Sequence, residues 1–158
     1  MLDQCPDLSP TSVDPVTGLS PLTAAAEGGD ADIVRSLIEA SSEDSLTILT
    51  CRDGHGHVPL HVAAMHGHVS VVELCLELGC DPEQGDGGRS ALELAAEAGH
   101  SDVVKLLVRR GVKLGSGALT QAIRGGHAEV SDVLVNELII NINLGLLLDC
   151  RVPARVWY

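Results

Sequence analysis

The chain has 158 residues, which is enough for one domain of ordinary size or for a short array of repeats. Hydrophobic residues make up 45% of it, but Phe is absent and Trp157 and Tyr158 are its only Trp and Tyr, so the core must be built from Leu, Val, Ile and Ala. This composition favours small packed helices in a thin, layered architecture. The formal net charge of -12 argues against binding to a nucleic-acid backbone, which requires clustered Lys and Arg.

The negative charge is concentrated in the first part of the chain. Residues 1–88 contain fifteen acidic and two basic residues, whereas residues 89–158 contain seven acidic and eight basic ones. Two interpretations are open: the acidic field keeps the chain soluble, or it steers a partner protein that carries a basic patch.

Residues 1–13 are expected to form a flexible N-terminal segment. The sequence MLDQCPDLSP lacks the basic start and apolar stretch of a signal peptide, and no apolar run in the chain approaches the roughly 20 residues of a membrane span. We therefore expect a cytoplasmic protein, with the nucleus as the alternative, and no membrane partner. Five cysteines at irregular spacing, without a CxxC pair, argue against a disulfide framework.

Comparison of the chain with itself reveals a repeat. Four segments align without an internal gap: GLSPLTAAAEGGDADIVRSLI (18–38), GHVPLHVAAMHGHVSVVELCL (56–76), GRSALELAAEAGHSDVVKLLV (88–108) and GALTQAIRGGHAEVSDVLV (117–135). Two markers, a Leu and a later Gly, recur with the same steps of 38, 32 and 27 residues: Leu22, Leu60, Leu92 and Leu119, then Gly29, Gly67, Gly99 and Gly126. The differences in length therefore fall between the units.

Each unit is predicted to contain two short helices. In the second unit, apolar residues at 60, 63 and 64 and again at 71, 72, 74, 75 and 76 follow helical spacing, and Gly67 stands where the first helix must end. Pro59 falls in the first turn of a helix, where its missing N–H costs nothing. Ala63 and Ala64 are too small to fill a core within one unit, so they predict close approach of a neighbouring helix.

These residues resemble the ankyrin repeat, whose pattern is a GxTPLHxAA first helix, a GH turn and a VVxLLL second helix. The second unit matches best, with eleven positions in agreement: Asp53, Gly56, Pro59, Leu60, His61, Ala63, Ala64, Gly67, His68, Val71 and Val72. The resemblance implies an all-α solenoid of stacked helix-turn-helix units over residues 14–137, with units at about 14–50, 53–84, 85–113 and 114–137. It also implies that His61, His68, His100 and His127 are structural residues that bond to neighbouring turns.

The chain departs from the ankyrin pattern in three places. An insertion at residues 39–51 predicts an extended, partly acidic loop, or a helix extension with a solvated turn. A deletion leaves GVKLGSG (111–117) where the family has a protruding hairpin. Gly117 and Ala118 also replace the Thr-Pro helix start and Thr120 replaces His, so the fourth unit should be the least stable. Residues 138–158 form a divergent apolar tail with three interpretations: a last helix that packs back on the fourth unit, an edge for a partner, or the end of a shortened chain.

A metal site and a catalytic cysteine are two alternatives to a purely structural interpretation of these residues. The histidines between 55 and 68, with Cys75 and Cys80 nearby, are chemically suitable zinc ligands, but no pair has the spacing of a known zinc module. Cys51 or Cys75 could be proposed as a nucleophile, but Cys75 lies within an apolar helical pattern, where an inert buried thiol is expected. We therefore expect no enzyme activity, no metal and no cofactor.

The function that this pattern favours is recognition of another protein by a monomeric adaptor, with no nucleic-acid partner. In a stack of helix pairs, the first helices and turn tips line one concave face, where residues that the fold does not need can select a partner. The predicted partner-binding residues are Leu19, Glu27, His55, His57, Met65, His66, Asp86, Arg89, Glu97 and Arg124. The alternatives are an inhibitor or regulatory subunit of an enzyme that uses the same face and, less favoured, a metal-dependent or thiol enzyme.

Overall fold

A computed structural model describes residues 9–41, 43–83 and 89–149. These residues contain nine helices and no strand, which confirms the all-α prediction. The helices are α1 (Pro21–Gly28), α2 (Ala31–Ala40), α3 (Ser45–Thr50), α4 (Pro59–His66), α5 (Val69–Glu77), α6 (Ala91–Ala98), α7 (Ser101–Arg109), α8 (Ser116–Gly125) and α9 (Ala128–Asp149).

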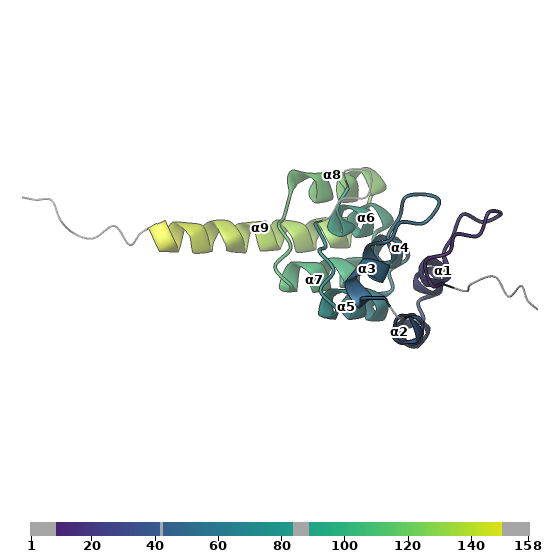
Figure 1. Cartoon of the computed structure of the whole chain (residues 1–158). Helices are drawn as coiled ribbons and strands as arrows, with labels where there is room; N and C mark the ends of the chain where they lie inside the picture. Colours follow the sequence, from purple (N-terminus) through teal and green to yellow (C-terminus); the bar gives the residue numbers. More distant parts are fainter. Residues whose placement is uncertain (1–8, 42, 84–88, 150–158) are drawn as a thin grey trace, which may run out of the picture.

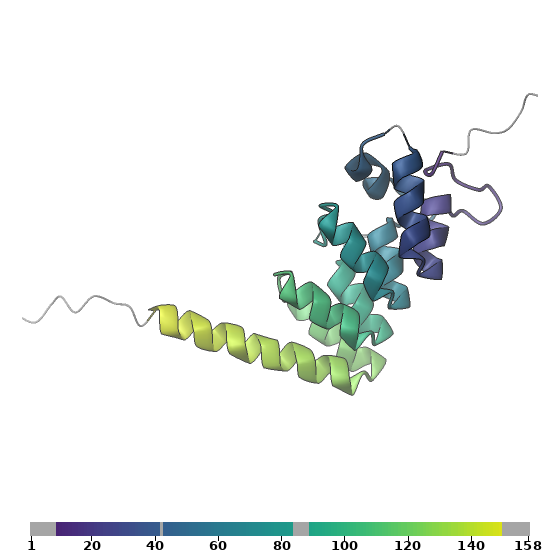
Figure 2. The ribbon, with the colours of Figure 1, turned by 90° about the horizontal axis from the view of Figure 1, so that it is seen from below.

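The helices stack in two layers (Figure 1). One layer holds the first helix of each unit, in the order α1, α4, α6 and α8, and each of these contacts the next one. The other layer holds α2, α5, α7 and the beginning of α9, which also contact one another in sequence. Figure 2 shows the second helices side by side along the stack. This arrangement is an ankyrin-repeat solenoid, as the resemblance implied.

Local signals define the ends of the first helices. At the start of α1, the Ser20 hydroxyl accepts a hydrogen bond from the Thr23 N–H at 3.1 Å, and the Thr23 hydroxyl accepts one from the Ser20 N–H at 2.9 Å. Ser90 and Glu93 form the same capping box on α6. All four first helices end on a glycine in the left-handed conformation, a backbone geometry that favours residues without a Cβ: Gly29, Gly67, Gly99 and Gly126. The recurring glycine of the sequence pattern is therefore the C-cap of each first helix.

The core lies between the two layers. Leu22, Leu60 and Leu92 are each 1% exposed. The predicted close approach between units is also observed, because the alanine pairs of the second and third units are completely buried: Ala63, Ala64, Ala95 and Ala96. The fourth unit differs, since Leu119 is only partly buried and the smaller Ala118 is buried in the helix that packs on α6. The fourth unit therefore buries a smaller side chain than leucine at this position.

The insertion at residues 39–51 is more ordered than the extended loop that the sequence predicted. It contains α3, whose Ile48 and Leu49 are 0% and 1% exposed, so the segment adds a short helix to the core. The expectation of a solvated loop was wrong because ILT (48–50), although short, supplies two adjacent apolar side chains that reach the core beside α2 and α4.

The apolar segment after residue 137 continues α9 without a break. This helix of 22 residues extends beyond the stack (Figures 1 and 2). Ile139, Ile140 and Ile142 are 51%, 49% and 61% exposed, so this part of the helix does not pack back on the fourth unit. The first of the three interpretations of the tail is therefore wrong for these residues.

Candidate functional site

Four of the predicted partner-binding residues of the second and third units, Met65, His66, Arg89 and Glu97, lie together near the C-terminal ends of α4 and α6. We call the surface formed by Glu27, Met65, His66, Arg89 and Glu97 the recognition face. Glu27 lies at the end of α1, Met65 and His66 lie at the end of α4, and Glu97 lies at the end of α6. Because each glycine C-cap ends its helix at the same level, these side chains form one row across three units.

A hollow of about 240 Å³ lies in the middle of the recognition face. It is lined by Met65 from α4, by Leu94, Glu97 and Ala98 from α6, and by Arg89 from the segment before α6. Leu94 is 3% exposed, which gives the hollow an apolar floor. Nη1 of Arg89 donates a hydrogen bond to Oε2 of Glu97 at 2.6 Å. The hollow therefore combines an apolar floor and a flexible thioether with a charged rim.

A contact between an imidazole and a carboxylate extends the row toward the first unit. Nε2 of His66 lies 3.9 Å from Oε1 of Glu27, and Nδ1 of the same ring donates to the Val62 carbonyl at 2.9 Å. Both side chains are accessible, with 42% of His66 and 46% of Glu27 exposed. The His66 ring also stacks on that of His68, with 6.2 Å between their centroids. Glu27 and His66 thus form the end of the recognition face that lies nearest the first unit.

The histidines of the GH turns have the structural role that the resemblance implied. Nε2 of His68 lies 2.7 Å from the Glu27 carbonyl, Nε2 of His100 lies 2.9 Å from the Met65 carbonyl, and Nε2 of His127 lies 2.9 Å from the Glu97 carbonyl. A carbonyl oxygen only accepts, so Nε2 carries the hydrogen in each ring. Each histidine thus fixes the end of the preceding first helix, where Glu27, Met65 and Glu97 project their side chains. His61, the remaining one of the four, is buried in α4.

His55 is more involved in the fold than the sequence predicted. Its Nε2 donates to the Thr17 carbonyl at 2.9 Å, and the neighbouring Gly54 N–H donates to the Gly18 carbonyl at 2.7 Å. The expectation that the fold does not need His55 was therefore wrong: it ties the loop of the second unit to that of the first. Gly18 makes room for this ring, because a Cβ built on Gly18 would lie 2.8 Å from Nε2 of His55.

The loop that carries His55 and His57 is organised by a buried carboxylate. Oδ1 of Asp53 accepts hydrogen bonds from the backbone N–H groups of His55 and His57, both at 2.9 Å. The two imidazole rings lie 6.2 Å apart, and His57 is partly buried. This loop adjoins the row of first helices but contributes nothing to the lining of the hollow.

The remaining predicted residues lie apart from the hollow. Leu19 is half-buried just before α1, and Arg124 is exposed in the last turn of α8. Asp86 lies outside the described residues. The sequence analysis did not single out Leu94 or Ala98, because neither belongs to the repeat pattern and both are small or apolar residues without a distinctive chemistry. Their only signal was the helical spacing of Leu94 and Ala98, four residues apart, on the same face of α6.

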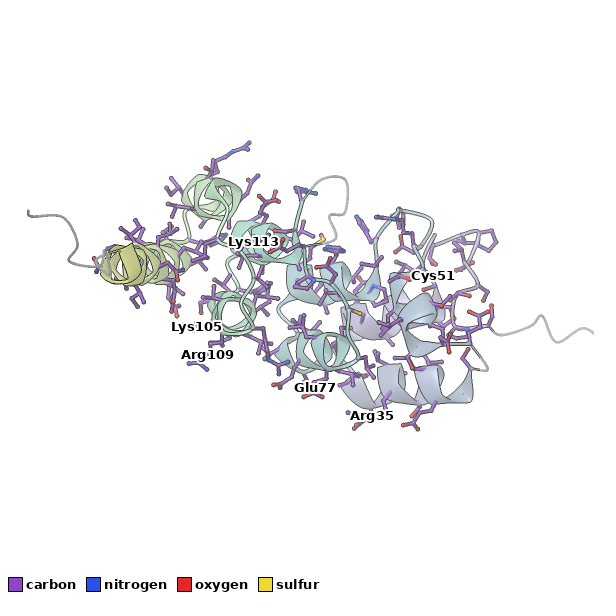
Figure 3. The ribbon with its side chains drawn as sticks, turned by 60° about the vertical axis from the view of Figure 1, so that its left-hand side comes forward. Arg35, Cys51, Glu77, Lys105, Arg109 and Lys113 are labelled. Atoms are coloured by element: carbon purple, nitrogen blue, oxygen red, sulfur yellow. The ribbon has the colours of Figure 1, made fainter. Side chains whose placement is uncertain are left out.

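The opposite layer is a mixed-charge surface. Figure 3 shows that charged side chains project from the second helices, among them Arg35, Glu77, Lys105 and Arg109. Ion pairs connect neighbouring units there: Arg110 to Glu73 at 2.9 Å and Lys105 to Glu129 at 3.1 Å. The hydrogen bond and charge of Lys105, together with a hydrogen bond from Ser101, hold the pKa of Glu129 below its ordinary value.

Two further kinds of feature, a metal-binding cluster and a membrane-spanning helix, are absent from the described residues. No group of three or more His, Cys, Asp or Glu side chains in residues 9–41, 43–83 and 89–149 is arranged to hold a metal ion. None of the helices in that same part of the chain is both long and apolar enough to cross a membrane.

Comparison with known proteins agrees with this architecture. The chain matches the family described as ankyrin repeats (3 copies) over residues 3–86 and 48–116. It belongs to the ankyrin repeat family. Ankyrin repeats are generally protein–protein interaction modules, and the family is typically non-catalytic.

Several ankyrin repeat proteins are similar to this chain. Ankyrin repeat domain-containing protein 63 of Homo sapiens is 31% identical over 153 residues, covering 90% of this chain and 39% of that protein. Its Mus musculus counterpart is 32% identical over 155 residues, with 90% and 38% covered. The Homo sapiens transient receptor potential cation channel subfamily A member 1 is 34% identical over 94 residues, with 60% and 8% covered. The chain thus spans less than half the length of these relatives.

Proposed function

We propose that this chain is a non-catalytic adaptor that binds a partner protein through its recognition face, with the hollow beside Met65 as the centre of the contact. The observation that carries the proposal is the lining of this hollow. Met65, Leu94 and Ala98 form an apolar surface inside the hollow, while Arg89 and Glu97 form a polar rim at its edge. An apolar centre surrounded by polar groups is the usual anatomy of a protein–protein interface.

The chemistry of the face indicates the kind of partner. A hollow of about 240 Å³ accommodates one large apolar side chain of the partner. Glu27 and Glu97 are both exposed; Glu27 lies in the acidic first part of the chain, and Glu97 lies beyond it in the third unit. A partner segment with an apolar anchor next to Lys or Arg would place a cation beside one of these carboxylates. The wider acidic field would speed the encounter of the two proteins.

Filling the hollow tests this proposal. Ala98 is exposed at the end of α6, so Ala98→Trp would place an indole over the hollow without entering the core. Ser36→Trp is the matched control, because Ser36 is exposed on α2 in the opposite layer. Both variants should unfold at nearly the same temperature as the unchanged chain, which circular dichroism would verify.

Peptides selected from a random display library on the unchanged chain would serve as probes. We expect the enriched peptides to share a large apolar residue next to Lys or Arg. Ala98→Trp should weaken their binding by at least about tenfold, or roughly 1.4 kcal/mol, whereas Ser36→Trp should leave it unchanged. Peptides whose affinity survives Ala98→Trp but falls with Ser36→Trp would place recognition on the opposite layer and contradict the proposal.

A further inference from the structure

Two cysteines meet where α5 ends. Cys75 is the third residue from the end of α5 and is completely buried, whereas Cys80 lies just beyond the helix and is partly exposed. The Cys80 N–H donates to the Cys75 carbonyl at 3.0 Å, and Gly79, with φ of +93°, turns the chain back between them. This hydrogen bond, which runs from one residue back to the residue five positions earlier, is the signature of a Schellman helix cap; a contact between the side chains at these two positions frequently accompanies it.

The third unit contains the same cap with carbon side chains. There the Val112 N–H donates to the Leu107 carbonyl at 3.2 Å, and Gly111 has φ of +83°. Leu107 and Val112 are 0% and 7% exposed and simply extend the core. The scaffold therefore needs only an apolar contact at this point. In the second unit, that contact has become a pair of thiols.

The two thiols differ in their surroundings. The Cys75 thiol donates a hydrogen bond to the Cys80 sulfur, which lowers the pKa of Cys80 below its ordinary value. The same hydrogen bond, together with burial, raises the pKa of Cys75. The thiolate is the reactive form of cysteine. The reactive sulfur is thus the accessible one, and the buried sulfur is already in contact with it.

From this geometry we propose that Cys75 and Cys80 form a redox modification site that closes reversibly to a disulfide when a hydroperoxide reaches Cys80. This inference goes beyond the proposed function and does not depend on it. A disulfide requires the two residues to be close before oxidation. The helix cap supplies that closeness through the 3.0 Å backbone hydrogen bond and the contact between the thiols.

The reaction proceeds in two balanced steps. The Cys80 thiolate attacks one oxygen of hydrogen peroxide; the S–O bond forms, the O–O bond breaks, and the departing hydroxide takes a proton to become water. The Cys75 sulfur then attacks the Cys80 sulfur; the S–S bond forms, the S–O bond breaks, and the Cys75 proton leaves with the hydroxide as a second water. Two thiols are oxidised while the peroxide is reduced to water, and a thiol reductant reverses the change.

The chain offers a simple readout for this site. Trypsin cleaves after Arg52 and Arg89, so one peptide, residues 53–89, contains Cys75 and Cys80 and no other cysteine. The reduced full-length chain would be treated with hydrogen peroxide under native conditions, alkylated, digested and analysed by mass spectrometry. We expect this peptide to lose the mass of two hydrogen atoms, to resist alkylation at both thiols, and to recover both properties after dithiothreitol.

Three variants assign the roles of the two sulfurs. Cys75→Leu, which copies Leu107, removes the resolving thiol, so Cys80 should accumulate as a sulfenic acid that dimedone traps, and its alkylation should become several-fold slower. Cys80→Val, which copies Val112, should leave Cys75 unoxidised. Cys51→Ser should form the disulfide as the unchanged chain does.

Two outcomes of the peptide analysis would overturn the proposal. In one, Cys80 itself gains oxygen atoms while Cys75 remains alkylatable, with fragmentation of peptide 53–89 separating this change from oxidation of Met65 in the same peptide. In the other, the cysteines of this peptide stay reduced under conditions that oxidise Cys51. Both results come from the unchanged chain, so they hold even where a variant fails to fold.

Discussion

The imidazole ring of His100 occupies the space that a Cβ on Gly67 would need. A Cβ built on Gly67 would lie 2.5 Å from Nδ1 of His100, and Nε2 of the same ring lies 2.9 Å from the Met65 carbonyl. The same arrangement joins His68 to Gly29 and His127 to Gly99. The histidine of one unit therefore supports the helix end of the preceding unit, so the position of the recognition face depends on contacts between neighbouring units.

Gly67→Ala should destabilise the protein more than Gly126→Ala. Both glycines have positive φ, +79° and +73°, so either alanine would be strained by roughly 1–2 kcal/mol. Only Gly67 faces a histidine ring, whereas nothing lies within 4 Å of a Cβ on Gly126. Displacing His100 from the Met65 carbonyl should cost about 1–3 kcal/mol more.

Urea denaturation of both variants would measure this difference. When Gly67→Ala is added to His100→Ala, the further loss of stability relative to His100→Ala alone should be no larger than the loss from Gly126→Ala, since the ring that the Cβ meets is then absent. Equal losses of stability in Gly67→Ala and Gly126→Ala would show that His100 does not couple the two units.

The buried leucines should dominate the free energy of unfolding. Leu60→Ala and Leu92→Ala should each lower it by about 2–5 kcal/mol, because both side chains are completely enclosed. Ile142→Ala should change it by less than about 0.5 kcal/mol, since this side chain is 61% exposed on the projecting part of α9. A larger loss from Ile142→Ala than from either leucine, measured in the same denaturation series, would mean that the core is centred elsewhere.

Much of this fold could be predicted because each unit repeats the same physical solution. Leu60 and Gly67 each recur at the same steps; the leucine is buried in the first three units, and the glycine is the C-cap of the first helix in all four. The insertion could not be predicted in this way. Ile48 and Leu49 occur once, with no counterpart in the other units, so the repeat gave no sign that they enter the core.

The candidate site was predicted in part, for a related reason. Subtracting the repeat pattern left Met65, Arg89 and Glu97 as residues with no structural role, and these three line the hollow. The subtraction failed for Leu94, which supports the core and also forms the floor of the hollow. It also failed for His55, whose bond to the Thr17 carbonyl occurs only between the first two units.

The carboxylate of Glu129 should titrate below its usual pKa of about 4.3. The folded-state pKa is lowered by Lys105 and Ser101, so ionised Glu129 favours the folded state. That contribution is present above the unfolded-state pKa and is lost as the pH falls through the folded-state value. The melting temperatures of the unchanged chain and of Glu129→Gln should therefore differ slightly at pH 7 and converge on acidification.

An NMR titration of the Glu129 side chain would give its pKa directly. The value should rise when Lys105 is replaced by Met. A midpoint at or above the ordinary value in the unchanged chain would contradict the ion pair between α7 and α9.

Partner binding should respond to changes on the recognition face and its flanking loop. Replacing His57, Met65 and His66 together with Ala should weaken binding of a selected peptide while leaving most of the core intact, because none of the three forms the buried leucine and alanine contacts. Replacing Asp86 with Lys should mainly slow association with a basic partner, and more so at low salt, since peripheral charges act chiefly on the encounter. Stopped-flow measurements and calorimetry on folded variants would separate the two effects. Unchanged affinity after all four substitutions would exclude these residues from the contact.

The methyl resonance of Met65 provides the most direct test of the central claim. The chain contains two methionines, Met1 and Met65. Labelling the methionine methyl groups with ¹³C therefore gives one signal from Met65 in the hollow and one from Met1. On addition of a selected peptide, the Met65 signal should shift and saturate, and the shift should be lost in Ala98→Trp. A peptide that binds with full occupancy while the Met65 signal stays in place would contradict recognition through this face.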